Sequence, residues 1–192
     1  MIKTILIDAD GVVLKPRDKF FSQRMNEDFG VPIEKVIPFF KNEYKQVVIG
    51  KADMKESVQK YLADWNWDKS VDELLQYWFG YENKIDQEVL NFVDELRAKG
   101  HKCYVVSDHS AYRADNLMKE VGLEKHFDGS FFSGYVGYTK EEPEFFAKVL
   151  EKLGLQKDEV LFIDDDPKNV EIAESVGIPS QVFKSISEIQ LL

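Results

Sequence analysis

The stretch Met1–Leu14, MIKTILIDADGVVL, contains the features that decide the fold. Its first half, residues 2–7, is an apolar, β-branched run whose length is typical of a buried strand. The run ends at two acidic residues, Asp8 and Asp10, and the next residue, Gly11, permits a sharp change of direction. Because an unpaired buried carboxylate is costly, two of them at a strand end indicate a bound cation or proton transfer. The alternative is a strand that runs into an acidic surface turn.

The composition is that of a globular protein. A chain of 192 residues with 44% hydrophobic residues can bury a sizeable core, as one domain or as a core with an insert. A formal net charge of −10 argues against nucleic acid or an anionic membrane as a partner. We find no apolar run of membrane-spanning length and no signal-peptide pattern, and the single cysteine, Cys103, lies in an apolar run. We therefore expect a cytoplasmic protein, monomeric or homodimeric, with a buried thiol.

Residues 15–85 show helical patterns and lack strong strand runs. Apolar residues recur at helical spacing around Phe21, Val36, Val58 and Leu74, and Asp53 is expected to cap one of these helices. The many aromatic side chains are expected to form the core of a small helical unit rather than a ligand cage.

From residue 86 onward, helices and strands alternate. Strands are expected at 101–106, 127–132, 160–163 and 181–183, and helices within 89–99, 111–121, 142–153 and 168–176, with a loop at 134–139. This alternation predicts an α/β fold with a parallel sheet and right-handed crossovers. Ligands bind beyond the carboxyl ends of such strands. The residues expected at that edge are Asp8, Asp10, Ser107, Lys140, Asp164 and Asp165.

Four short motifs, in the same order, resemble those of the haloacid dehalogenase superfamily in its phosphatase branch. They are DADGVV at residues 8–13, Ser107 after an apolar strand, Lys140 ahead of Pro143, and FIDDDPKNV at residues 162–170. The helical insert is similar in position and size to the family's first type of helical cap. The resemblance implies a Rossmann-like α/β core domain made of residues 1–14 and 86–192, with residues 15–85 as the cap domain.

The resemblance also implies an activity: Mg²⁺-dependent hydrolysis of a small phosphomonoester, such as a sugar phosphate, through an aspartyl-phosphate intermediate. Asp8 would be the nucleophile, and Asp10 would be the general acid and then the general base. Lys140 would place a positive charge against Asp8 and the phosphoryl group. Mg²⁺ would be held by Asp8, by the backbone carbonyl of Asp10, and by Asp164 and Asp165, a set of oxygen ligands that this ion prefers.

The phosphate-binding residues implied by the resemblance are Ser107, Asp108 and Lys140. The sequence departs from the family at two of these places. Asp108 stands where Asn is frequent, and Glu141 follows Lys140 where Pro is frequent. A carboxylate beside a bound phosphate would repel it unless it points away or pairs with a cation. His109 is a candidate cation, although the simpler reading makes it a loop residue without a role.

Several residues near the motifs have alternative interpretations. Asp166 and Asn169 are expected to cap the next helix or to support the metal ligands. Lys15 and Arg17 are interpreted as solvated hinge residues that lie near enough to reach an anionic substrate.

Three other functions stay open from the sequence. A sugar phosphomutase of the same superfamily would use the same nucleophile, acid and Mg²⁺. A dehalogenase would lack the acid at Asp10, and a non-catalytic binding protein would have lost Asp8 or Asp10. Both acids are present, so a phosphatase acting on a small phosphorylated metabolite is the favoured interpretation.

Overall fold

The chain folds around one parallel sheet. The computed structural model describes residues 2–190, so Met1, Leu191 and Leu192, which belong to the expected core domain, lie outside the described residues. Among residues 2–190, five parallel strands lie in the order β3-β2-β1-β4-β5. Their bounds are Thr4–Asp8 (β1), Lys102–Ser107 (β2), Gly129–Phe132 (β3), Val160–Asp164 (β4) and Ser180–Val182 (β5). The predicted α/β class is confirmed.

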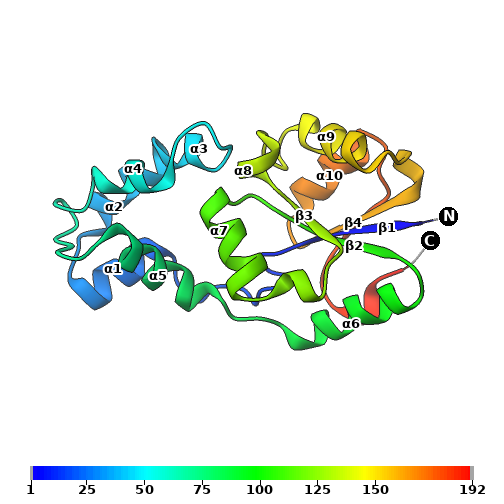
Figure 1. Cartoon of the computed structure of the whole chain (residues 1–192), viewed down its shortest axis with the longest axis horizontal. Coiled ribbons are helices and arrows are strands. Elements are labelled where there is room, and N and C mark those ends of the chain that lie inside the picture. Colours follow the sequence, from blue (N-terminus) through cyan, green and yellow to red (C-terminus); the bar gives the residue numbers. More distant parts are fainter. Residues whose placement is uncertain (1, 191–192) are drawn as a thin grey trace.

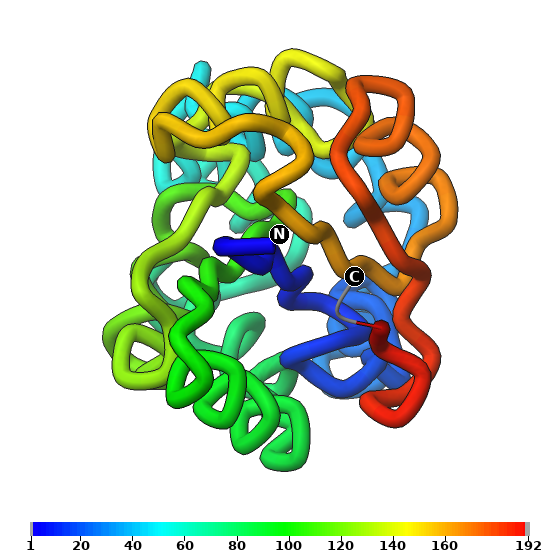
Figure 2. Tube along the Cα trace, turned by 90° about the vertical axis from the view of Figure 1, so that its right-hand side faces the viewer, coloured from blue at the N-terminus to red at the C-terminus, as the bar shows by residue number. Residues whose placement is uncertain are grey.

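Helices cover both faces of the sheet (Figures 1 and 2). One face packs on α6 (Gln87–Ala98), α7 (Ala111–Asp115) and the following turn η1 (Asn116–Glu120). The other packs on α9 (Pro143–Leu153) and α10 (Pro167–Ser175). In β1, Ile5 and Ile7 belong to the first core cluster and Leu6 to the second. Because both faces are buried, the strand reads as a continuous apolar run rather than an alternating one.

Some elements differ from the sequence expectation. The helix expected at 111–121 changes to a π-helix at η1, where the N–H of Val121 bonds the carbonyl of Asn116 at 2.9 Å. The loop expected at 134–139 begins inside a short helix, α8 (Ser133–Val136). Apolar spacing does not distinguish an α-helix from a single π-turn, so the sequence could not show this change. Short 3₁₀ turns lie between or after the other elements: η2 (Leu123–Lys125), η3 (Lys157–Glu159) and η4 (Ile186–Glu188).

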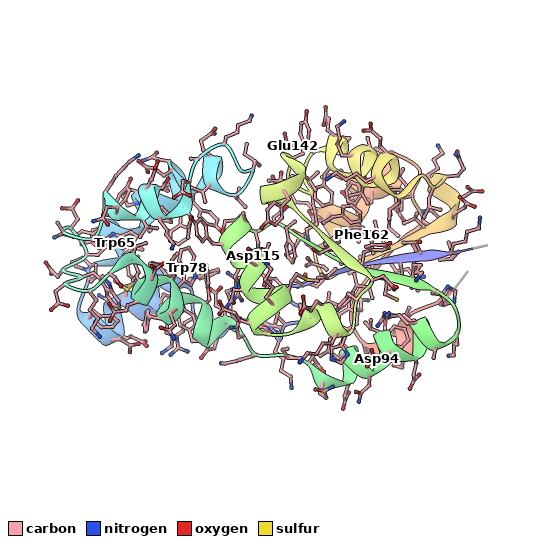
Figure 3. All side chains as sticks on the ribbon, in the orientation of Figure 1. Trp65, Trp78, Asp94, Asp115, Glu142 and Phe162 are labelled. Carbon is pink, nitrogen blue, oxygen red and sulfur yellow. The ribbon has the colours of Figure 1, made fainter. Side chains whose placement is uncertain are left out.

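The helical insert between β1 and α6 has a hydrophobic core of its own. Its helices are α1 (Phe21–Phe29), α2 (Ile33–Lys41), α3 (Tyr44–Val47), α4 (Met54–Gln59) and α5 (Val71–Glu82). As predicted, the carboxylate of Asp53 caps α4 by accepting from the N–H of Glu56 at 2.9 Å. Trp65 and Trp78 lie inside this unit (Figure 3), with Trp65 fully buried. Within residues 2–190, none of the helices has the length and apolar character needed to cross a membrane.

Two neighbouring chain segments join the insert to the sheet. The N–H of Lys15 donates to the carbonyl of Lys84 at 2.8 Å, and the N–H of Asp86 donates to that of Val13 at 2.9 Å. Leu14 and Ile85 also form an antiparallel bridge. The predicted boundaries at residues 15 and 85 therefore fall in one paired connection, which places the insert beside the carboxyl edge of the sheet (Figure 1).

Candidate active site

The candidate site lies where β1 and β4 end side by side in the centre of the sheet. In this strand order the chain leaves these two strands in opposite directions, which opens a crevice at their carboxyl ends. A cavity of about 720 Å³ lies there. Of the residues predicted from the sequence, its lining includes Asp8, Asp10, Ser107, Asp108, Lys140 and Asp165. Asp164 is fully buried beneath it.

Lys140 joins the two strand ends through its ammonium group. Its Nζ lies 2.5 Å from Oδ1 of Asp8 and 2.7 Å from Oδ2 of Asp164, and the residue is 4% exposed. Burial alone would lower the pKa of Lys140, but the charges of Asp8, Asp164 and Asp108 outweigh it and raise the pKa. The lysine is therefore a fixed positive charge between two buried carboxylates.

Three carboxylates offer a place for a divalent cation. Asp8, Asp164 and Asp165 each present one oxygen, and these oxygens lie within 4.8 Å of one another. Burial raises the pKa of Asp8 well above its usual range, and Asp164 adds to this effect while Lys140 opposes it. Burial and then Asp164 likewise raise the pKa of Asp165. When ionised, the three carboxylates carry more negative charge than Lys140 neutralises, and hard oxygen donors of this kind suit Mg²⁺.

Gly11 brings the loop after β1 close to this cluster. Its φ of +78° lies in the left-handed region, and a Cβ placed there would lie 2.0 Å from Oδ2 of Asp165. Any side chain at this position would therefore collide with one of the three carboxylates.

The loop after β4 and the first turn of α10 hold Asp164 in place. The side-chain amide of Asn169 donates to both carboxylate oxygens of Asp164, at 3.1 and 3.3 Å. The N–H of Asp166 donates to Oδ1 of Asp164 at 2.8 Å. Asp166 itself caps α10, because its Oδ1 accepts from the N–H of Lys168 at 2.9 Å. Asp166 therefore acts as the expected cap, while Asn169 orients a carboxylate of the cluster.

Asp10 faces the same cavity but has its own cationic surroundings. Arg17 donates a hydrogen bond to its Oδ2, and Nε2 of His109 lies 3.4 Å from its Oδ1. Burial alone would raise the pKa of Asp10, but the charges of His109, Arg17 and Arg113 outweigh it and lower the pKa. Arg17, interpreted from the sequence as a solvated hinge residue, instead pairs with Asp10 and, together with His109, favours its ionised form.

The loop after β2 shows where the extra carboxylate of Asp108 points. Its Oδ1 and Oδ2 accept from the backbone N–H of Lys140, at 2.9 and 3.2 Å. Ser107, 2% exposed, lies just before it at the end of β2. The carboxylate thus accepts from the Lys140 backbone, and the ion-pair contact of His109 is with Asp10. The role of Asp108 in phosphate binding stays a prediction.

Sequence reasoning missed two buried charges behind Asp10. Nη1 of Arg113 donates to Oδ1 of Asn83 at 2.5 Å and to Oδ1 of Asn116 at 2.8 Å. Its Nη2 lies 4.0 Å from Glu82, whose side chain is 7% exposed. Both residues lie on amphipathic helices, where a charged residue normally indicates a solvated face, so the sequence carried no signal of their burial.

Comparison with known proteins agrees with this geometry. A family model described as haloacid dehalogenase-like hydrolase matches residues 2–177. The chain belongs to this family. The predicted resemblance and the prediction of an enzyme are both confirmed.

Relatives of this haloacid dehalogenase-like hydrolase have different named substrates. It is 25% identical over 186 residues to a phosphorylated carbohydrates phosphatase of Thermotoga maritima, covering 92% of this chain and 82% of that protein. It is 23% identical over 185 residues to the GMP/IMP nucleotidase YrfG of Escherichia coli, covering 92% and 80%. A solved family enzyme of Bacteroides thetaiotaomicron, in complex with magnesium and inorganic phosphate, has a TM-score of 0.82 at 22% identity and covers 96% and 95%.

Proposed function

We propose that this hydrolase is a Mg²⁺-dependent phosphatase that cleaves small phosphomonoesters through an aspartyl-phosphate on Asp8. The observation that carries the proposal is the buried contact of Lys140 with Asp8 and Asp164, with Asp10 facing the same cavity. The names of the two relatives and the magnesium and phosphate bound to the Bacteroides enzyme support it.

Asp8 is the residue that attacks phosphorus. A carboxylate oxygen of Asp8 forms a bond to phosphorus while the bond from phosphorus to the alcohol oxygen breaks. Lys140 keeps Asp8 oriented and offsets the negative charge of the phosphoryl oxygens. Asp8, Asp164 and Asp165, with the backbone carbonyl of Asp10, are the proposed ligands of Mg²⁺. When bound, the ion neutralises charge on both the nucleophile and the phosphoryl group.

Asp10 moves the protons. It gives one to the departing alcohol and then takes one from the water that hydrolyses the aspartyl-phosphate. The ionised form that Arg17 stabilises is suited to the second step, because it accepts a proton. In the first step Asp10 must hold a proton, and a longer distance from His109 and Arg17 would favour that protonated form.

The phosphate is held at the end of β2. Ser107 contributes its hydroxyl, the loop at Asp108 contributes its backbone N–H, and Lys140 contributes its ammonium group. The carboxylate of Asp108 accepts from the backbone of Lys140 and so is not free to face the phosphate at the same time. In this role Asp108 links the second and third motifs and holds the backbone of Lys140 in position.

We further propose that residues 15–85 act as a mobile cap. The insert is attached through the paired segments at residues 13–15 and 84–86, and Arg17 follows directly on this connection. Closure would exclude water from the cavity and change the position of Arg17 relative to Asp10. Solution scattering should show a smaller radius of gyration with Mg²⁺ and a metal fluoride than with Mg²⁺ alone. An identical curve in both conditions would contradict a closing cap.

Product analysis tests the reaction. Purified protein with Mg²⁺ and hexose 1-phosphates should release free phosphate in a one-to-one ratio with sugar, with or without a hexose bisphosphate primer. Isomerised sugar phosphate without phosphate release would identify a phosphomutase and contradict the proposal. Chloride release from a 2-chloro acid, without any phosphatase activity, would identify a dehalogenase.

The role of Asp10 has a separate test. Asp10→Asn should slow hydrolysis of an alkyl phosphate more than that of p-nitrophenyl phosphate, because proton donation matters most for a basic leaving group. Equal losses of kcat/KM for both substrates would assign Asp10 a structural role.

A further inference from the structure

A second cavity, of about 210 Å³, adjoins the catalytic one. Arg17 and Phe20 line both cavities, so the two spaces are neighbours on either side of these side chains. The rest of its wall comes from apolar residues of the helical insert. We call this space the aromatic pocket, formed by Phe20, Phe21, Ile37, Phe40 and Trp78.

The back wall of the aromatic pocket is fixed by packing inside the insert. The rings of Phe21 and Trp78 stack with centroids 4.5 Å apart and an interplanar angle of 28°. Phe40 meets Trp78 edge to face at 5.4 Å. Phe21 and Trp78 are only 2% and 5% exposed, and Trp78 lies well inside the insert in Figure 3. A ligand would therefore meet a preformed apolar surface and would not have to order it on binding.

The front of the pocket is open to solvent, and two large, exposed apolar side chains border it. Phe20 is 64% exposed and Ile37 is 36% exposed. The backbone of Phe20 is held in place, because its N–H donates to Oε1 of Gln23 at 2.8 Å. Exposed apolar side chains that border a preformed cavity are the pattern expected where a ligand covers them.

The polar groups of the pocket are largely engaged with protein atoms. Oε1 of Glu82 accepts from the indole N–H of Trp78 at 3.1 Å, and Arg17 pairs with Asp10 and lies 3.7 Å from Glu82. Ser22 adds one hydroxyl. A carbohydrate or a nucleobase buried here would lose hydrogen bonds to water that these groups do not replace.

We infer that the aromatic pocket binds a flat, apolar group, such as a phenyl ring, carried by the alcohol part of the phosphomonoester substrate. The inference rests on the proposed function and names a substrate class for it. The phosphate occupies the end of the cavity at Asp8 and Ser107, and the alcohol passes Arg17 and Phe20 to reach the aromatic wall. An aromatic ring gains both apolar burial and edge or stacking contacts there. This assignment favours an apolar alcohol over the sugar phosphate expected from the sequence.

Two alkyl phosphates, one with a phenyl ring and one without it, test the inference. We would measure kcat/KM for Mg²⁺-dependent phosphate release from 2-phenylethyl phosphate, ethyl phosphate and glucose 6-phosphate, all esters of primary alcohols. Burying the phenyl ring should make 2-phenylethyl phosphate the best of the three, with kcat/KM about tenfold or more above that of ethyl phosphate.

Variants locate the effect in the pocket. Phe20→Ala and Ile37→Asn should each lower the ratio of kcat/KM for 2-phenylethyl over ethyl phosphate by about three- to tenfold. The matched control is Phe29→Ala. Phe29 is 41% exposed on the same insert, but its ring contacts those of Trp67 and Tyr77, outside the pocket. This variant should keep the wild-type ratio. Circular dichroism checks that all three variants are folded.

The outcomes separate the two proposals. Hydrolysis of ethyl phosphate with a ratio near one, a preference for glucose 6-phosphate, or a ratio unchanged in both folded pocket variants would overturn the substrate assignment and leave the phosphatase standing. Failure to release phosphate from all three esters would overturn the proposed function, and the substrate class with it.

Discussion

The carboxyl edge of the sheet and the core of the helical insert are both buried, but they bury opposite kinds of side chain. At the sheet edge the buried groups are charged: Asp8 and Asp164 face Lys140. In the insert they are aromatic: Phe39 and Trp65 are fully buried, with ring centroids 5.7 Å apart. Ring burial stabilises a fold directly, whereas a buried ion cluster loses much of its Coulomb energy to desolvation. The difference indicates that the insert core is built for stability and the sheet edge for chemistry.

Replacing the nucleophile should produce the largest effect on activity. It should also show that the sheet edge serves chemistry and not stability. Asp8→Asn should lower kcat for phosphate release by about a thousandfold or more, because it removes both the attacking oxygen and a proposed metal ligand. The stability of the Asp8→Asn variant, by contrast, should increase. Burial raises the pKa of Asp8 in the folded state, so its ionisation destabilises the fold as pH rises above its ordinary value of 3.8.

Urea unfolding in EDTA should therefore show Asp8→Asn to be more stable than the wild type at pH 7, with the difference shrinking toward pH 4. A folded variant that keeps substantial phosphate release would contradict the assignment of the nucleophile. A variant less stable at pH 7 than the wild type would contradict the contrast between the two regions.

In the insert the expected loss is one of stability. Phe39→Ala removes a fully buried ring that packs against Tyr61 and Trp65, and it should lower the free energy of unfolding by about 3–5 kcal/mol. Urea titration followed by tryptophan fluorescence would measure the loss. Phe29→Ala, at a 41% exposed position, is the matched control and should lose much less. Equal losses for the two variants would show that the aromatic core is not tightly packed.

A glycine substitution probes the sheet edge without replacing a charged residue. Gly11→Ala places a methyl group against Asp165, so the Mg²⁺ concentration for half-maximal activity should rise by about ten- to a hundredfold. The control is Gly154→Ala, also at a positive φ, of +65°, where a Cβ meets no atom within 4 Å. It should lose stability through backbone strain and keep the wild-type Mg²⁺ requirement. An unchanged requirement in Gly11→Ala would remove Asp165 from the proposed ligands.

Inside the sheet, away from its charged edge, the expected effect is on chemical labelling and not on activity or stability. Cys103 in β2 is fully buried, and burial raises the pKa of its thiol to about 12 from an ordinary value of 9.0. Since the thiolate is the reactive form, iodoacetamide at pH 9 should label the native protein about a hundredfold or more slowly than the urea-unfolded protein. Equal labelling rates would mean that this part of the sheet opens readily.

The motif residues could be predicted because their signals are local. An apolar run followed by Asp8 and Asp10, and another followed by Asp164 and Asp165, marks two strand ends whatever the rest of the chain does. Parallel pairing of the two strands then brings the acids together. The surroundings of Asp10 could not be predicted in this way, because its contacts with Arg17 and His109 depend on how the insert and the loop after β2 fold back over it.

The sequence by itself determined the fold class and the order of the strands along the chain. It also determined which side chains stand at the strand ends, because hydrophobic period and residue type fix these locally. Only the tertiary structure decided which groups the charged side chains contact. It turned the Asp108 carboxylate toward the backbone of Lys140, buried Arg113 against the insert, and placed Arg17 where it lines both the aromatic pocket and the catalytic cavity. These contacts join residues distant in sequence, and their energies depend on burial and distance, which the order of residues does not specify.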